Sequence, residues 1–224
     1  MQIKKYLSQV DAIQNPFPGI YTLVMSSLGK PFKFYPGQFL HLAIDSDYDG
    51  IGQWPESRCF SIQSSPDEHT LKITYSVKGS FTQKMEQQLK PLSKVWLKLP
   101  YGNLFTQPHH KENCVFIAGG TGITPFLSLF NHSSFDEYTN PFIYVGFKSP
   151  DFNIYQNELE QIKDKTTIFY ENEVGQIDMK KIFENHGTNS CYFLSGPPEM
   201  IKSFKIYLLE QKVSETNLLT DDWE

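Results

Sequence analysis

The strand and helix signals of this chain change in kind near residue 107. Before that point, short segments rich in β-branched and aromatic residues alternate with turn sequences such as those at 15–19 and 35–37. The pattern predicts strands at residues 6–13, 20–25, 38–44, 58–62, 71–77 and 94–99, and one helix at 81–89. Six short strands close most economically as a small antiparallel β-barrel.

Beyond the polar stretch 106–112, strand and helix signals alternate. Strands are predicted at 115–118, 142–145, 167–170, 191–194 and 217–219, and helices after Pro125, near 155–162, near 178–183 and at 198–211. Repeated βα units predict a five-stranded parallel sheet with helices on both faces. We therefore expect two domains, a six-stranded antiparallel β-barrel at 1–106 and an α/β domain at 107–224.

A glycine turn follows the first strand of the α/β domain. Residues 115–126 read VFIAGGTGITPF, so an apolar strand meets Gly119, Gly120 and Gly122 and then a helix with Pro125 in its first turn. Backbone N–H groups at such a turn favour a phosphate, and glycine leaves no side chain in the way. No Gly-Lys-Ser/Thr follows, and Pro125 stands where a Gly-x-Gly-x-x-Gly motif has its third glycine. A tight structural connection is the alternative interpretation.

A second turn of the same type follows the strand at 191–194. Residues 194–200 read LSGPPEM, with Gly196 and Pro197 leading into a helix. If both strands lie near the middle of the sheet, this turn should lie beside the first one. Taken alone, it can equally be structural.

The most informative segment of the barrel is Arg58-Cys59-Phe60-Ser61. Side chains alternate along a strand, so Arg58 and Phe60 should share one side of it. The segment can then offer a guanidinium to a phosphate, a ring for stacking and a hydroxyl for hydrogen bonding. The alternative is an ordinary barrel strand, with Arg58 solvated and Phe60 in the core.

A strand end that runs into a helix supplies the other barrel candidate. The residues are Val77, Lys78, Gly79, Ser80, Phe81 and Thr82. Gly79 gives access to the backbone, and Ser80 or Thr82 can either cap the helix or contact a phosphate. A plain helix cap is the alternative.

Composition excludes several other classes of function. The formal charge of −5 leaves no basic stripe for nucleic acid, and no apolar run is long enough for a membrane span. Three distant cysteines and six histidines without ligand spacing predict neither a metal site nor an iron–sulfur cluster. The N-terminus lacks the apolar core of a signal peptide, so we expect a cytoplasmic protein.

Taken together and in order, these motifs resemble those of the ferredoxin-NADP reductase superfamily. The family's Arg-x-Tyr-Ser flavin motif matches Arg58, Phe60 and Ser61, with Phe60 in place of the tyrosine, which keeps the stacking ring and removes a hydroxyl, and its Gly-x-x-Ser/Thr turn matches Gly79 and Thr82. Its nucleotide motif Gly-Gly-x-Gly-x-x-Pro matches Gly119, Gly120, Gly122 and Pro125, and its Cys-Gly-Pro motif matches Gly196 and Pro197 with Ser195 in place of cysteine. The resemblance covers nearly the whole chain.

The resemblance implies an FAD-binding barrel, with FAD in preference to FMN, and an NAD(P)-binding domain. Hydride would pass between the nicotinamide and the flavin where the domains meet, and electrons would go on to a separate acceptor protein. Arg58 would bind the pyrophosphate, Phe60 would stack on the flavin, and Ser61 and Ser195 would be the catalytic residues. The other implied cofactor contacts are Cys59, Val77, Gly79, Ser80, Phe81, Thr82, Gly119, Gly120, Thr121, Gly122, Thr124, Pro125, Gly196, Pro197 and, as a cover for the flavin ring, Trp223.

Two questions stay open at this level. Residues 171–173 read ENE where a 2′-phosphate would want basic residues or serine, which favours NADH over NADPH, although Lys148 and Ser149 could serve instead. The chain could also reduce free flavin or a small acceptor, or be a non-catalytic module that kept the fold, since Ser195 replaces the family cysteine.

Overall fold

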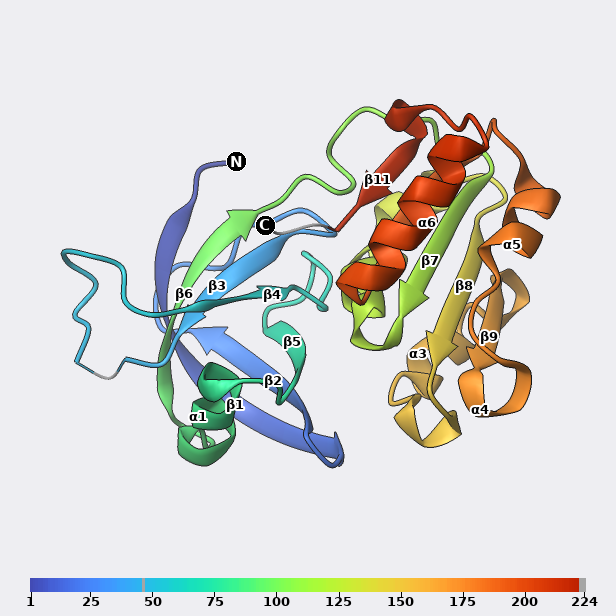
Figure 1. Ribbon diagram of the computed structural model, residues 1–224. Helices are drawn as coiled ribbons and strands as arrows, with labels where there is room; N and C mark the ends of the chain where they lie inside the picture. The colour runs from blue at the N-terminus through green and yellow to red at the C-terminus, as the bar shows by residue number, and fades with distance from the viewer. Residues whose placement is uncertain (46, 222–224) are drawn as a thin grey trace. The chain divides into compact units, whose positions relative to one another are not determined.

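The computed structural model describes residues 1–45 and 47–221 (Figure 1). Its contacts divide the chain into two compact units. Unit 1 comprises Met1–Phe105 and Thr124–His132, and unit 2 comprises Thr106–Ile123 and Ser133–Glu224. The chain thus leaves unit 1 after Phe105, returns to it for nine residues, and leaves it again.

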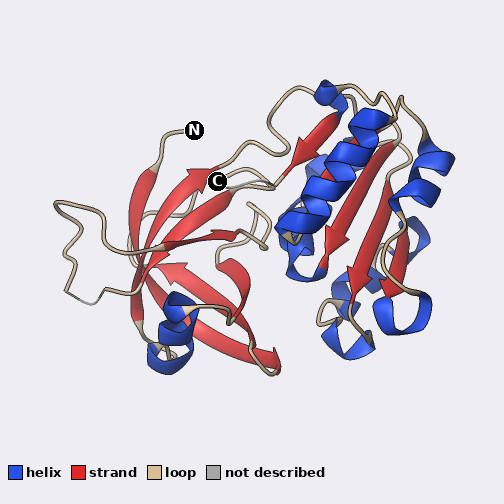
Figure 2. Cartoon of the chain, viewed as in Figure 1, coloured by secondary structure: helices blue, strands red, loops and turns tan. Residues whose placement is uncertain are grey.

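Unit 1 is built on a six-stranded antiparallel sheet that curls into a near-barrel (Figure 2). Its strands are β1 (Lys4–Phe17), β2 (Ile20–Ser27), β3 (Phe39–Ala43), β4 (Arg58–Ser61), β5 (Leu71–Ser76) and β6 (Lys94–Tyr101), in the order β4-β3-β6-β1-β2-β5. The two edge strands meet just beyond β4, where the amide of Gln63 donates to the carbonyl of Lys72 at 2.8 Å. The predicted barrel is confirmed.

The strand register shows which residues share an end of this sheet. Ser61 lies opposite Phe39, and Phe39 lies opposite Tyr101. Lys4, the first residue of β1, lies opposite Leu99 near the end of β6. The last residue of β4 and the first residues of β1 are therefore at the same end of the sheet, which we call the Ser61 rim.

The interior of unit 1 is apolar, as the alternation of its strands requires. The buried cluster contains Tyr6, Val10, Leu23, Met25, Phe34, Leu40, Leu42, Phe60, Ile62, Leu71, Ile73, Tyr75, Phe81, Met85, Val95, Leu97 and Leu99. Phe81 and Met85 come from helix α1 (Ser80–Gln88), which buries one face against the barrel. This helix begins one residue earlier than predicted and ends one residue earlier.

Helix α2 (Thr124–Phe130) also belongs to unit 1. The hydroxyl of Ser128, which is fully buried, donates to the carbonyl of Ser64 at 2.7 Å. The ring of Phe126 lies 6.0 Å from that of Phe105. Contacts within the barrel unit therefore fix the helix that follows the glycine turn. One of these contacts is with Ser64, three residues past the end of β4.

Unit 2 contains the parallel sheet that the sequence predicts. Its strands are β7 (Cys114–Gly119), β8 (Phe142–Phe147), β9 (Thr166–Tyr170), β10 (Cys191–Ser195) and β11 (Leu218–Thr220), in the order β11-β10-β7-β8-β9. All four pairings are parallel, and every strand lies within two residues of its predicted position. β7 is the central strand, and β10 is its direct neighbour.

Both faces of this sheet are covered. Helices α5 (Met179–His186) and α6 (Pro198–Glu210) pack on one face, with Ile182, Ile201 and Leu208 among the buried contacts (Figure 1). On the other face the rings of Phe116 and Phe193 stack at 4.8 Å. The remaining segments are α3 (Gln156–Glu160), α4 (Glu171–Val174), η1 (Gly120–Ile123), η2 (Ser133–Glu137), η3 (Pro150–Phe152), η4 (Lys163–Lys165) and η5 (Glu215–Asn217).

Helix α4 and the 3₁₀ segments were not predicted, because they are too short to show a hydrophobic period. Within the described residues, no helix combines the length and the apolar character needed to cross a bilayer.

Candidate cofactor sites

Arg58 begins β4 and reaches toward helix α1. Its guanidinium carbon lies 5.1 Å from the centre of the Phe81 ring, and its side chain is 51% exposed. Nη1 donates to the carbonyl of Ser57 at 2.8 Å, and Nη2 lies 3.2 Å from a carboxylate oxygen of Glu56. These contacts hold a positive group at the surface beside the start of α1.

The start of α1 combines local capping with open space. The hydroxyl of Thr82 accepts hydrogen bonds from the amides of Lys78 (2.9 Å) and Gly79 (3.1 Å) and donates to the carbonyl of Gly79 (3.0 Å). Thr82 therefore caps the helix in this structure, which is the alternative to a phosphate contact that the sequence left open. A Cβ added to Gly79 would meet nothing within 4 Å. The first amides of the helix, including that of Ser80, have no intrahelical acceptor.

Phe60 lies on the same side of β4 as Arg58, but in the barrel core. Its ring is 5.9 Å from that of Tyr75, and only 7% of the residue is exposed. Little of Phe60 is thus left exposed for stacking on a flavin. Ser61, the last residue of β4, is also buried, at 6% exposure. Val77, beyond β5, is half-buried against the same core.

Cys59 points away from Arg58 and Phe60, as alternation requires. Its sulfur lies 3.5 Å from Nε2 of His41. Burial raises the pKa of the Cys59 thiol, and it lowers the pKa of His41, which the charge of Lys98 lowers further. The thiol and the imidazole are therefore both neutral. The side chain of Cys59 faces His41, so only the backbone of Cys59 can reach the side of the strand on which Arg58 lies.

In unit 2 the two glycine turns pack directly against each other. Ala118 and Ser195 are paired at the ends of β7 and β10. A Cβ added to Gly122 would lie 2.4 Å from the Cα of Gly196, and one added to Gly196 would lie 2.9 Å from the amide nitrogen of Gly119. The two turns lie side by side, as predicted.

The three positions of the first turn are occupied by glycine for different structural reasons. A Cβ on Gly119 would lie 2.8 Å from Cδ of Pro197, so Gly119 and Gly122 are required by packing between the turns. Of these three glycines only Gly120 has a positive φ, at +55°. Beyond Gly120 there is nothing within 4 Å of an added Cβ, so this is where a ligand can approach the backbone.

The remaining residues of this turn are less open. Thr121 is half-buried, and Thr124 and Pro125 are buried at the start of α2. Pro125 occupies the second helical position, where its missing N–H costs no hydrogen bond, as predicted.

Ser195 makes a contact that the sequence did not reveal. The residue is 1% exposed, and its hydroxyl donates to Oδ2 of Asp221 at 3.2 Å. The amide of Asp221 donates to the carbonyl of Leu194 at 2.9 Å, which continues the β10–β11 pairing by one residue. The one sequence signal for this contact was Asp221 itself, a carboxylate directly after the last strand, β11. Trp223 lies outside the described residues.

The loops after β8 and β9 lie next to each other. Phe147 and Tyr170 pair at the ends of these strands, and the amide of Asn172 donates to the carbonyl of Lys148 at 3.2 Å. Glu171 and Glu173 are exposed in α4. The two groups of residues that bear on coenzyme choice are thus neighbours at the carboxyl edge of the sheet.

These features fit the two groups that the resemblance implies. Unit 1 offers a surface guanidinium and a buried serine at the two ends of β4, with the open amides at the start of α1 beside the guanidinium, which suits a cofactor with phosphates at one end and a ring at the other. Unit 2 offers two glycine turns at the carboxyl ends of adjacent central strands, where parallel sheets bind nucleotides.

Comparison with known proteins is consistent with this arrangement. Residues 116–205 match the family model described as the oxidoreductase NAD-binding domain. The chain is 26% identical, over 99% of its length, to the reductase component of propane 2-monooxygenase from Mycolicibacterium smegmatis, and it covers 68% of that protein. It is 25% identical to the phenol hydroxylase P5 protein of Acinetobacter pittii, with 98% and 65% of the two chains covered. The chain thus spans about two thirds of the length of these relatives.

A solved structure is similar over its whole length. The ferredoxin NADP⁺ reductase of Neisseria gonorrhoeae, solved with FAD and NADP, matches with a TM-score of 0.77, and the match covers 98% of each chain. The sequence identity is 16%, so this likeness shows the fold alone.

Proposed function

Because the chain belongs to the ferredoxin-NADP reductase superfamily, we propose that it is an FAD-dependent NAD(P)H reductase. In this proposal it transfers hydride from NAD(P)H to bound FAD and passes the electrons to a separate acceptor protein in the cytoplasm. The observation that carries the proposal is the pair of glycine turns packed against each other at the ends of β7 and β10. The relatives that are named as reductase components support the acceptor.

Each residue has a task in this proposal. Bound FAD would accept two electrons as hydride and release them singly, which nicotinamide cannot do. Arg58 would pair with the pyrophosphate beside the first amides of α1, with Gly79 giving access to the backbone. Ser61 would offer its hydroxyl to the flavin ring, and Gly120 would admit the NAD(P)H pyrophosphate to the backbone of its turn.

Ser195 would face the nicotinamide from the end of β10. The hydroxyl hydrogen of Ser195 points at Asp221, because the hydroxyl donates to that carboxylate. The lone pairs of the serine oxygen can therefore still accept a hydrogen bond. An amide N–H of the nicotinamide carboxamide is the kind of group that this oxygen can accept from. A serine would then orient the ring, although a thiol does so in the family motif.

We propose NADH as the preferred coenzyme. Glu171 and Glu173 are exposed at the end of β9, where their charge opposes a 2′-phosphate and their oxygens can accept from a ribose hydroxyl. Lys148 is the nearby positive group, with its ammonium 5.9 Å from the ring centre of Phe152. Glu171→Lys should therefore improve the use of NADPH relative to NADH, and Glu184→Lys, on the exposed side of α5, is the matched control.

Anaerobic titration of the FAD-loaded protein tests the proposal. NADH should bleach the flavin absorbance, and NADPH should need a higher concentration to do so. A protein that takes up no FAD contradicts the proposal. A protein that holds FAD but is bleached by neither nucleotide supports a non-catalytic module instead. Turnover with free FMN, but with no carrier protein, supports a free-flavin reductase.

A further inference from the structure

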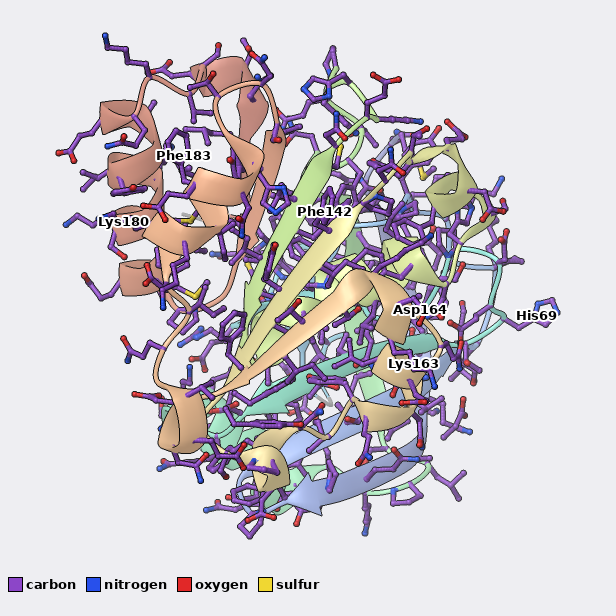
Figure 3. All side chains as sticks on the ribbon, turned by 90° about the vertical axis from the view of Figure 1, so that its right-hand side faces the viewer. His69, Phe142, Lys163, Asp164, Lys180 and Phe183 are labelled. Carbon is purple, nitrogen blue, oxygen red and sulfur yellow. The ribbon has the colours of Figure 1, made fainter. Side chains whose placement is uncertain are left out.

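The parallel sheet of unit 2 ends in an open edge strand. β9 is the last strand in the order β11-β10-β7-β8-β9, and within residues 1–45 and 47–221 it pairs with β8 alone. Figure 3 looks onto this edge, with β9 in front and no other helix or strand of unit 2 drawn across it. β9 is therefore a template of five residues for a further strand.

The backbone of β9 directs hydrogen-bonding groups away from the sheet. The amide of Asn172, just past the strand, donates to the carbonyl of Lys148 at 3.2 Å, in step with the β8–β9 register. In a parallel ladder every second residue bonds to the neighbouring strand, so the even-numbered residues of β9 bond to β8. Thr167 and Phe169 then point their N–H and C=O groups outward. Within the part of the chain that the structure describes, no other group bonds to these four.

The side chains of β9 carry no charge. The strand reads Thr-Thr-Ile-Phe-Tyr, and each of its residues is exposed or half-buried. Every residue of β10, in the interior of the sheet, is buried. An uncharged and accessible edge strand favours pairing with another chain.

The two ends of β9 carry charges of opposite sign. Lys163 and Lys165 lie in η4 just before the strand, with Asp164 between them, so η4 has a net charge of +1. Glu171 and Glu173 lie in α4 just after the strand, which has a net charge of −2. All five side chains are exposed. In an antiparallel pair of two such segments, the basic end of each meets the acidic end of the other, so the segment is complementary to itself.

One antiparallel register satisfies the backbone and the charges together. When Ile168 lies opposite Ile168 of a second copy, Thr167 of each copy lies opposite Phe169 of the other. The outward groups then form four hydrogen bonds, and Lys165 comes opposite Glu171. A shift by two residues in either direction places Thr167 or Phe169 opposite a residue outside β9. The side chains of the two Ile168 residues contact each other across the pair.

Contacts within the chain hold these charges only weakly. Lys163 lies 2.7 Å from a carboxylate oxygen of Glu160, but both side chains are 64% exposed. Lys165 forms no ion pair within the described residues. Glu171 accepts from the side-chain amide of Gln176 at 2.9 Å, and a carboxylate can accept further hydrogen bonds. Exposed pairs of this kind add little stability, so these groups can turn to a second copy.

We propose that β9 is a contact between two copies of this chain, which pair antiparallel about a two-fold axis at Ile168. The sheets of the two copies then form one continuous sheet. Four backbone hydrogen bonds and the charge pairs at both ends hold the contact. It buries little surface, so the dimer is a weak one that forms at micromolar concentrations or above. The inference does not depend on the proposed reaction.

A charge exchange between the two ends tests the pairing. Lys163→Glu/Lys165→Glu makes both ends of the segment acidic, and Glu171→Lys/Glu173→Lys makes both ends basic. Each variant alone should self-associate at least tenfold more weakly than the parent protein, because like charges now face each other. An equimolar mixture of the two variants should form a heterodimer, since every opposed pair is then of opposite sign.

Two other variants test the position of the contact and the role of the backbone. Lys202→Glu/Lys212→Glu makes the same change of charge in and after α6, which packs on the sheet beside β10. β10 is three places from β9, roughly 14 Å along the sheet, so this control should associate as the parent does. Thr167→Pro removes an outward N–H without removing a bond to β8, so it should fold and remain a monomer.

Sedimentation velocity of the 224-residue, FAD-loaded chain at low salt measures association from about 5 to about 500 µM. A parent protein that is monomeric throughout this range overturns the proposal. Equal association of the parent, both charge variants and the mixture also overturns it, as does a dimer that persists in Thr167→Pro. If Thr167→Pro does not fold, the charge exchange still decides. Oligomeric state is the readout because Glu171 also belongs to the coenzyme proposal, so a failure to oxidise NADH leaves this test unaffected.

Discussion

Replacement of Gly122 by alanine examines the packing of the two glycine turns. The new Cβ would lie 2.4 Å from Cα, 2.6 Å from N of Gly196 and 2.7 Å from C of Ser195, all backbone atoms. Ordinary contact between such atoms begins near 3.4 Å, so the turns must separate by about 1 Å. Overpacking of this kind costs about 1–3 kcal/mol, and rigid backbone on both sides puts Gly122→Ala at the upper end, about 3 kcal/mol.

Gly120→Ala, two residues away in the same turn, is the matched control for stability alone, because Gly120 is itself a proposed contact of NAD(P)H. Its Cβ would meet nothing within 4 Å, so only its positive φ opposes the substitution, at a cost of about 1–2 kcal/mol. Urea unfolding gives both free energies, and equilibrium titration gives the affinity for NADH. We expect Gly122→Ala to be less stable than Gly120→Ala. We also expect Gly122→Ala to bind NADH at least tenfold more weakly than the parent protein does. Equal stability of Gly122→Ala and the parent protein would refute the backbone-to-backbone packing.

Three further perturbations test single contacts. Arg58→Ala should weaken FAD binding about tenfold, through loss of a charge-assisted contact of about 1.5 kcal/mol, and unchanged FAD retention in a dialysis assay would contradict the assignment. Ser128→Ala should lower the free energy of unfolding by about 1–3 kcal/mol, because the buried hydrogen bond to Ser64 is lost. The control is Ser203→Ala at an exposed position, which should change the free energy of unfolding by less than about 0.5 kcal/mol. Equal effects of the two substitutions would argue against the hydrogen bond. Because burial lowers the pKa of His41, the unfolded chain binds a proton that the folded chain does not, and the free energy of unfolding should fall as the pH drops below about 6.5. Burial lowers the pKa of His109 and His186 as well, so His41→Gln should reduce this slope without abolishing it, and an unaltered slope would exclude a contribution from His41.

The fold was predictable because local signals agree with the tertiary structure. The strands of both sheets alternate with clear turn residues, and the βα units of unit 2 allow few arrangements other than a parallel sheet. Helix α4 has four residues, so no period could reveal it. The boundaries of β1 were missed by several residues, because its polar ends pair with β6 and β2 without an apolar signal.

The candidate sites were predictable in composition but less so in geometry. The sequence located the turns at Gly119 and Gly196, yet it assigned their glycines to ligand access when two of the first three serve packing. It also did not show how deeply Phe60 is buried, because burial depends on Tyr75, fifteen residues away. The partner of Ser195 was missed for the same reason, since only the β10–β11 pairing brings Asp221 to it.

The discontinuous outline of unit 1 bears on how such a chain can be recombined. Residues 124–132 lie within the span that matches the oxidoreductase NAD-binding domain, yet their contacts, through Phe126 and Ser128, are with the barrel. A cut after Phe105 would separate α2 from Phe105 and Ser64 and leave a helix whose first six residues are all buried in the intact chain. Exchange of the nucleotide-binding half between relatives therefore has to treat α2 as inherited with the barrel, and the natural unit of exchange is not a continuous stretch of sequence.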